Sequence, residues 1–524
     1  MKRNIVLWAQ GLLLGAFFTG CYTYTPPPAV LEGETFTQRQ TGEGDLILKR
    51  ASGKLTLDKA IEIAIANNPD YISAYHSVNA AKMSYYQAWG AWSPTISTSF
   101  GMQQTHNNYY HQVNTSSPRN SNFTTSTGIQ ASWLVFDGLA RDMAILAAEH
   151  GYNYQGQMRE DIRRRLILSV AYAYNDILLA NEKRRIAVAD KEFEIQQLEE
   201  TRIKLNAGTA ALSDLLNFQI KVNDAISKEA IAEYEYRVAV YTLAQLLGYP
   251  EGVFPEDVTF QEFDDTIDDM LTRVDVYLDT ALHNRPDLAA YREQLEVTRY
   301  NMYQTYSAFS PQVSIDAAFG FNTSYGRTYG NNGLNNFHHT YQNSPSFSYG
   351  LNANWTIFNG LQRYNAMRSA QAQVAAAEFT VASSWLAVVN EVRTAYEYYV
   401  QNVKLAKNYK KDLSLVIKQR DLVEEQYRVG TCNITRLNEA QLSLVDAETA
   451  LVSALINLRN AKAQLDAVTN SNLIGYTNEI AGEEKQLVDI DATRQKLNAE
   501  NLSVDVPEIT RDLSEVEKDL IIPQ

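Results

Sequence analysis

The stretch Trp133-Leu134-Val135-Phe136-Asp137-Gly138 returns 222 positions later as Trp355-Thr356-Ile357-Phe358-Asn359-Gly360. Further toward the N-terminus, Asn67-Asn68-Pro69-Asp70 reappears as Asn284-Arg285-Pro286-Asp287, shifted by 217 positions. The shift changes only within a polar segment between these motifs, where surface loops tolerate changes of length. The sequence therefore predicts two copies of one structural unit, residues 57–248 and residues 276–470.

Two short alternating patterns precede the helical part of each copy. Apolar and polar residues alternate from Val313 to Asn322 and again from Phe347 to Ile357, and the first copy repeats this more weakly. Strands of about 9 to 11 residues with one apolar face can cross a bilayer, although a soluble sheet with one wet face alternates in the same way. We expect strands near 95–103, 127–136, 312–322 and 347–358, with polar surface loops over 103–125 and 323–345.

Each strand pair leads into a very long helical pattern. No proline occurs in residues 119–249 or 346–506, so a helix of roughly 100 Å is permitted after each quoted stretch. Apolar residues at Val381, Trp385, Val388 and Val392 follow a period of about 3.5 residues, which predicts left-handed supercoiling. Because glycine readily ends a helix, we expect helical hairpins with their tips at Gly208-Thr209 and Gly430-Thr431.

The N-terminus has the pattern of an export signal. Lys2 and Arg3 precede an apolar run that ends in Phe18-Thr19-Gly20-Cys21. This pattern resembles a bacterial lipobox, which implies a signal peptide over residues 1–20 and acylation of Cys21, followed by an anchor and linker over 21–56. Tyr22 is not the aspartate that retains many lipoproteins at the inner membrane, which favours the outer membrane. The alternative is an ordinary signal peptide with an incidental cysteine.

Composition argues against several classes of protein. The net charge of −15 leaves no basic surface for nucleic acid. With Cys21 acylated, Cys432 is the only remaining thiol, so neither an intrachain disulfide nor a cysteine zinc site is expected. We predict no metal site at His106, His111, His338 or His339, and no catalytic motif indicates an enzyme. Beyond the signal, we expect no apolar stretch long enough for a membrane helix, so strands must make any crossing.

The order of these elements resembles the TolC-like outer-membrane efflux proteins, and Cys21 points to their lipoprotein branch. The resemblance implies an α+β membrane protein with a duplicated repeat. It implies a homotrimer whose protomers each give four strands to a 12-stranded transmembrane β-barrel, continuous with a long α-helical periplasmic barrel. Independently, open sheet edges in lipid are costly, which favours oligomerisation. The implied partners are a periplasmic membrane-fusion adaptor and an inner-membrane transporter, and the only implied cofactor is covalent lipid on Cys21.

The resemblance also assigns roles to the hairpin tips. Gly208, Thr209, Gly430 and Thr431 would face the adaptor. The family carries acidic residues six and nine positions after the second tip glycine, but here those positions hold Arg436 and Glu439, and the first copy has Asp214 and Asn217. These four residues are the candidate periplasmic gate. We hypothesise that Asp214 and Arg436 pair between neighbouring hairpins; the alternative is that both are ordinary solvated charges.

Besides the signal and the anchor and linker over 21–56, two further segments lie outside the copies, and three functions remain open. Residues 249–275 link the copies in an equatorial region, and residues 471–524 form an acidic tail that is equatorial or partly disordered. The favoured function is the outer-membrane exit duct of a tripartite efflux system. The alternatives are the outer-membrane component of a type I protein secretion system, or a membrane-anchored trimeric scaffold for structure or adhesion.

Overall fold

The computed structural model describes residues 53–108, 119–249, 252–254, 258–267, 272–329 and 337–470. The chain divides into two compact units, Met1–Thr469 and Asn470–Gln524, and the first contains nearly all of the described residues. The expected signal, Cys21, the linker before residue 53 and the tail after residue 470 lie outside them.

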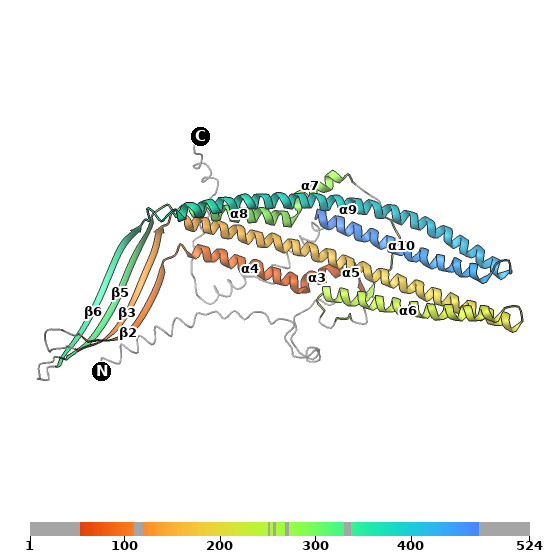
Figure 1. The fold of residues 1–524 in the computed structure, drawn as a ribbon, viewed down its shortest axis with the longest axis horizontal. Coiled ribbons are helices and arrows are strands. Elements are labelled where there is room, and N and C mark those ends of the chain that lie inside the picture. The colour runs from red at the N-terminus through yellow and green to blue at the C-terminus, as the bar shows by residue number, and fades with distance from the viewer. Residues whose placement is uncertain are drawn as a thin grey trace. The chain divides into compact units, whose positions relative to one another are not determined.

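Four long strands form one antiparallel sheet (Figure 1). Its strands are β2 (Thr95–Asn108), β3 (Arg119–Phe136), β5 (Gln312–Tyr329) and β6 (Phe337–Asn354), paired in the order β2-β3-β5-β6. The two copies join at β3 and β5, where Ile129 lies opposite Phe319 and Ser132 opposite Asp316. Within the described part of the chain, β2 and β6 each lack a partner on one side, so the sheet has two free edges.

The strands reach further into the polar segments than expected. β2 continues to Asn108, β3 begins at Arg119, β5 continues to Tyr329, and β6 begins at Phe337. β6 also ends at Asn354, so Trp355 to Phe358 do not belong to the strand as the sequence pattern suggested. The reason is that ladder hydrogen bonds join backbone groups, so polar side chains outside the apolar stretch do not end a paired strand. The expected loops over 103–125 and 323–345 are therefore largely strand where they are described.

The helices repeat element for element in the two copies. The first copy contains α3 (Leu57–Asn67), α4 (Pro69–Gly90), α5 (Ala140–Asn206) and α6 (Leu212–Leu246), and the second contains α7 (Val274–Asn284), α8 (Pro286–Ser307), α9 (Gln362–Arg428) and α10 (Ile434–Thr469). The long helices α5 and α9 each have 67 residues, which corresponds to roughly 100 Å. Figure 1 shows α5 with α6, and α9 with α10, as two hairpins that extend away from the sheet. A short parallel pair, β1 (Lys54–Leu55) with β4 (Thr259–Phe260), lies beside them.

The repeated Pro-Asp motif ties the short helices to the returning long ones. Asn68 caps α4 through its side-chain oxygen, which accepts from the backbone N–H of Asp70 and of Tyr71. Its side-chain nitrogen donates to the carbonyl of Leu246 at the end of α6, at 3.1 Å. Arg285 holds the same position in the second copy and donates to the carbonyl of Val468 at the end of α10, at 3.5 Å. Different side chains thus satisfy the same orphan carbonyls of a helix end.

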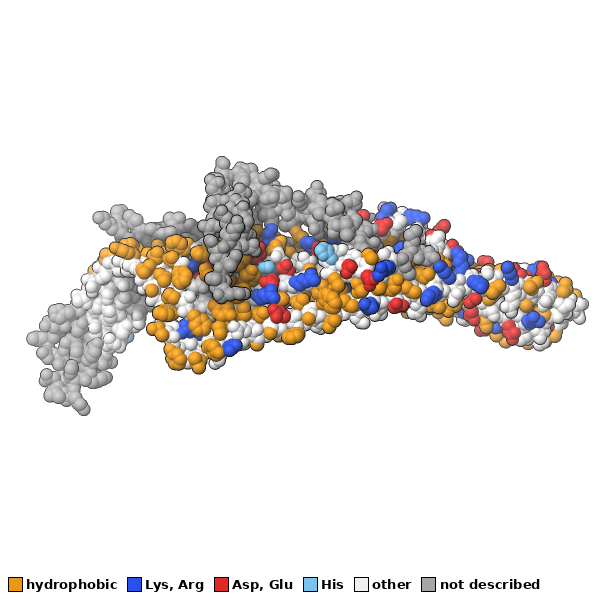
Figure 2. Space-filling view, turned by 90° about the horizontal axis from the view of Figure 1, so that it is seen from above, with side chains coloured by type: hydrophobic (Ala, Val, Ile, Leu, Met, Phe, Trp, Pro, Cys, Tyr) orange, Lys and Arg blue, Asp and Glu red, His pale blue; other side chains and the backbone are white. Residues whose placement is uncertain are grey.

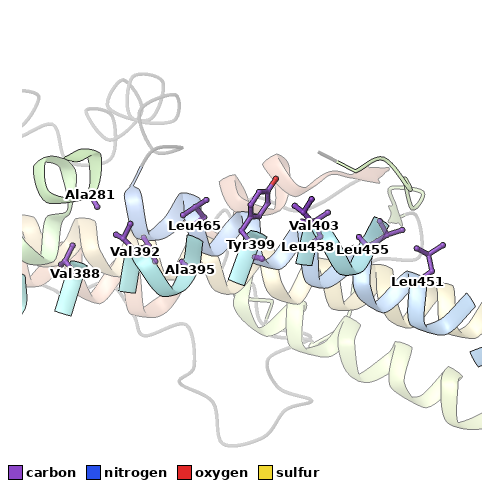
Figure 3. Packing of buried hydrophobic residues seen from close by; sticks show 13 residues of the cluster. Ala281, Val388, Val392, Ala395, Tyr399, Val403, Leu451, Leu455, Leu458 and Leu465 are labelled. Carbon is purple, nitrogen blue, oxygen red and sulfur yellow. The ribbon is translucent and has the colours of Figure 1, made fainter. Parts of the chain in front are cut away.

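The core of the second copy follows the predicted heptad pattern from Val388 onward, whereas Trp385 is exposed within the single chain. Val388, Val392, Ala395 and Tyr399 of α9 are all buried and contact a row of leucines on α10 (Figure 3). The same positions that step by four and three residues in the sequence face the partner helix, as left-handed coiled-coil packing requires. On the face shown in Figure 2, hydrophobic side chains crowd the helices near the sheet, and charged side chains become more frequent toward the hairpin tips.

One expectation about membrane helices was wrong. α9 contains a window of 18 residues with a mean hydropathy of 1.3, which by length and composition could cross a membrane. Only 6% of that window is buried within the single chain. The sequence pattern did not indicate such a helix, because polar residues interrupt the apolar ones of α9 and no continuous apolar run results.

Candidate functional site

Each strand pair joins its long helix through the same junction. Gly138 and Leu139 have φ of 70° and 71°, and their counterparts Gly360 and Leu361 have φ of 66° and 65°. A leucine in the left-handed region is strained, so the surrounding contacts must hold it there. In the first copy, the indole N–H of Trp133 donates to the carbonyl of Trp92 at 3.0 Å.

Arg141 holds the first junction together from its centre. Its side chain is buried and donates to the carbonyls of Leu134 at 2.6 Å and Val135 at 3.2 Å. It also pairs with the buried carboxylate of Asp137 at 3.0 Å, and its guanidinium lies 4.1 Å from the ring centre of Trp92. One side chain therefore binds the end of β3, the start of α5 and the residues that follow α4.

The two hairpin tips are nearly identical in geometry. Gly208 and Gly430 have φ of 75° and 76°. The backbone N–H of Thr209 bonds the carbonyl of Lys204 at 2.9 Å, and that of Thr431 bonds the carbonyl of Gln426 at 2.8 Å. Each threonine hydroxyl donates to the same carbonyl at 3.0 Å. These are Schellman-type helix ends, in which the threonine adds a second bond to a terminal carbonyl.

The candidate gate residues follow the tips but do not all meet. Asp214 is half-buried in the first turn of α6, whereas Arg436 is exposed on α10. Among the described residues of one chain, no ion pair joins them. Asn217 instead accepts a hydrogen bond from the side chain of Asn438 at 3.1 Å, and Glu439 is exposed. The first and second hairpins therefore touch through Asn217 and Asn438, a contact that the sequence did not indicate.

A buried polar row on α5 was also missed from the sequence. Asp190, Glu194, Gln197 and Thr201 are all buried and continue the heptad spacing that apolar residues hold nearer the sheet. Gln441 of α10 donates to Asp190 at 3.0 Å. Burial, reinforced by the neighbouring Asp190 charge, raises the pKa of Glu194 to about 7. Polar residues at heptad core positions were the signal that could have revealed this row.

Several oxygen atoms of this row have no hydrogen-bond donor within the described part of the chain. They are Glu194 Oε2, Gln197 Oε1 and Gln441 Oε1. An unpaired buried acceptor costs about 1 to 3 kcal/mol, so the row is a weakly held part of the contact between the two hairpins. Beside the row, a buried apolar cluster of Phe218, Val423, Leu437 and Ala440 also joins the two hairpins.

The histidine and cysteine positions offer little chemistry. Within the described residues, no group of three metal-binding side chains comes together. His339 bonds the hydroxyl of Tyr325 at 2.8 Å, whereas His111 lies outside the described residues. The Cys432 thiol is half-buried and donates to the carbonyl of Val423 at 3.5 Å.

Comparison with known proteins places this geometry among outer-membrane channels. Residues 60–249 and 277–471 match the family model described as outer membrane efflux protein. The chain is 25% identical over 390 residues to the outer membrane protein TolC of Escherichia coli, covering 73% of this chain and 76% of that protein. It is 24% identical to the alkaline protease secretion protein AprF of Pseudomonas aeruginosa, covering 57% of this chain and 58% of that one. A crystal structure of CusC superposes with a TM-score of 0.65 at 16% identity, covering 79% of this chain and 91% of that one.

Proposed function

Because the chain belongs to the outer membrane efflux protein family, and so forms an exit duct in the outer membrane, we propose that it conducts its cargo passively and catalyses no reaction. It works as a homotrimer with a periplasmic adaptor and an inner-membrane transporter. Its relatives are channel proteins rather than enzymes. The observation that carries the proposal is the sheet with an apolar face and two free edges, since only closure with other copies satisfies those edges in lipid.

We propose that the hairpin tips are the adaptor-facing end. Gly208 and Gly430 leave open space where a side chain would be, and both tips expose their threonines. Small residues permit close backbone approach by a partner. The threonine hydroxyls already satisfy carbonyls of the helix ends, so a docked partner would not have to.

The gate is proposed to lie just behind the tips, at Asp214, Asn217, Arg436 and Glu439. Asn217 is held by Asn438 of the same chain. Asp214 and Arg436 have no ion-pair partner in the described part of one chain, so a neighbouring copy is available to both. An exposed pair contributes only about 0 to 1 kcal/mol, which suits a gate that must open.

Single-channel conductance of the purified trimer in planar bilayers tests the duct and the gate together. The wild-type trimer should conduct with small currents, and Asp214→Ala or Arg436→Ala should each raise the current. Glu192→Gln, on an exposed face of α5 remote from the tip, is the matched control and should leave it unchanged. A trimer that never conducts would favour a membrane-anchored scaffold, and unchanged currents in both tip variants would remove the proposed pair.

We also propose that Cys21 carries the lipid anchor. The support is the short apolar segment and the small residues that precede it. Cells grown with a labelled fatty acid should label the wild-type protein and not Cys21→Ala. Label retained in the variant would leave only an ordinary signal peptide.

The cargo is open between small molecules and polypeptides. AprF, by its name, takes part in secreting a protease and matches 57% of this chain, whereas TolC matches 73% of it at a similar identity. We propose small-molecule efflux as the principal role, with type I protein secretion as the alternative. Deleting the gene and comparing drug susceptibility with the secreted protein profile separates them, since loss of secreted proteins alone would support the alternative.

A further inference from the structure

The polar face of the four-stranded sheet carries one acidic residue. Within β2, β3, β5 and β6 the charged residues are Arg119, Asp316 and Arg327. By strand alternation, positions 119 and 327 lie on the same face of the sheet as Phe123 and Tyr325. This is the apolar face, which exposes Ile129 and Phe319. Asp316 lies on the opposite face, level with Ser132.

The carboxylate of Asp316 is fixed to the wall by three donors. One oxygen accepts from the hydroxyl of Ser132 at 2.6 Å. The other accepts from the hydroxyl of Ser314 at 2.9 Å and from the amide of Asn352 at 2.6 Å. These bonds reach across β3, β5 and β6, so the negative charge has one defined position on the sheet.

Small residues surround this charge and leave it accessible. Gly350 lies directly opposite Asp316 on β6, and a side chain added there would meet nothing within 4 Å. The rest of the polar face is built largely from serine and glycine: Ser97, Ser99, Gly101, Ser126, Gly128, Gly320, Ser346 and Ser348. Such side chains are too short to screen the carboxylate from the space in front of the sheet.

We propose that Asp316 is a selectivity-determining residue of the duct: three copies form a negative ring on the inner wall of the barrel and favour cations there. The inference rests on the proposed duct function. Asp316 is the fifth residue of β5, so the ring lies near the end where the strands meet the helices. It acts at a different level from the candidate gate, which lies beyond 67-residue helices at the hairpin tips.

Electrostatic screening gives the inference a distinctive signature. Twelve tilted strands about 4.8 Å apart enclose a barrel with a backbone radius of about 12 Å. The field of the ring must therefore act over roughly 10 Å to reach the axis. This distance equals the Debye length at about 0.1 M salt, and it is about three times the Debye length at 1 M salt. Cation preference due to Asp316 should be present at the lower concentration and vanish at the higher one.

The test measures block of the wild-type trimer in planar bilayers by a cation added to one side only. The trimer is added to one compartment, so that its helical end stays in that compartment and its barrel end faces the other. Hexaamminecobalt(III), a trivalent cation, is added to the barrel side at about 0.1 M salt, where screening is incomplete. It should block the wild-type current, and Asp316→Asn should abolish that block. Asp316→Glu retains the charge and should retain the block.

The control separates the effect of the Asp316 charge from the effect of the hydrogen bonds that hold it. Ser132→Ala removes one donor and leaves the carboxylate in place, so block should persist with an altered affinity. Barrel-side block that survives in Asp316→Asn, or is lacking in the wild type, overturns the inference while leaving the duct intact. A wild-type trimer without any current overturns the duct itself, and the inference with it. Trimer yield of each variant on gel filtration shows whether lost block reflects lost folding.

Discussion

The two strand-to-helix junctions share their backbone and differ in one charge. In the first, Arg141 is paired with buried Asp137. In the second, Arg363 donates to the carbonyls of Ala308 at 2.7 Å and Ile357 at 2.9 Å, and Asn359 stands where the aspartate would be. Trp355 repeats the bond of Trp133, to the carbonyl of Phe309 at 3.1 Å. The arginine and the tryptophan therefore suffice to hold the backbone of the junction. The aspartate occurs only in the first junction, where the arginine is buried within one chain.

The largest effect is expected from breaking the first junction. Arg141→Met leaves the Asp137 carboxylate buried without its partner, which costs about 3 to 5 kcal/mol. Arg363→Met removes bonds to carbonyls from a side chain that is only partly buried, and should cost about 1 kcal/mol. Thermal dissociation of the trimer in detergent measures both. The second substitution Asp137→Asn should restore much of the loss in Arg141→Met, and equal losses in the two single variants would contradict the comparison.

A smaller effect is expected at the end of α6, which differs from the end of its counterpart α10. Gly248 ends α6 with φ of 73°, and its counterpart Asn470 has φ of 54°. A side chain at Gly248 would place its Cβ 2.7 Å from the carbonyl oxygen of Asn67. Gly248→Ala should therefore cost more than the roughly 1 to 2 kcal/mol of left-handed strain alone.

The matched control for that clash is Gly430→Ala. Gly430 has φ of 76° with open space around it, so its variant should show the strain without the clash. Thermal unfolding followed by circular dichroism compares the two. A Gly430→Ala variant as unstable as Gly248→Ala would show that contact with Asn67 contributes nothing.

A further effect concerns pH and the contact between the hairpins. The raised pKa of Glu194, about 7 against its usual 4.5, means that the folded protein holds a proton between these values which the unfolded chain has released. Stability should fall as pH rises through this window and stay reduced above it. Glu194→Gln should therefore raise the melting temperature at pH 8 and change it little at pH 4.5, whereas the exposed Glu192→Gln should change neither. An equal rise at both pH values would assign the effect to something other than ionisation.

The two long helices differ at this level of the hairpins. Val416 and Val423 of α9 stand where α5 has Glu194 and Thr201. At the other two positions of the row, α9 has Asp412 and Gln419, which are as polar as their counterparts Asp190 and Gln197. The two copies therefore differ at two of the four positions, and Val423 belongs to an apolar cluster with Phe218 of α6. Glu194→Val would make the first copy resemble the second at this position.

Sequence periodicity predicted the duplicated hairpins well because a heptad pattern and a glycine stop both depend on local chemistry. The family comparison confirmed the efflux channel fold, and the gate and tip assignments stay predictions. Strand ends were poorly predicted because backbone pairing does not depend on polar side chains. The contact between Asn217 and Asn438 could not be predicted, since it depends on how two hairpins distant in sequence lie together.

The open space beside Gly360 bears on how the duct can change over evolution. Gly138 touches Ser310, with only 2.6 Å between a side-chain carbon added there and the serine Cβ, whereas Gly360 has nothing within 4 Å in the single chain. Ser93 is the counterpart of Ser310 in the first copy, so we expect a neighbouring Ser93 to occupy that space. Around the trimer, contacts between repeats within one chain would then alternate with equivalent contacts between neighbouring chains. Because the repeat is duplicated in one gene, the contacts within a chain and the contacts between chains can acquire different residues. Substitutions that ease the separation of subunits therefore need not destabilise the subunit itself.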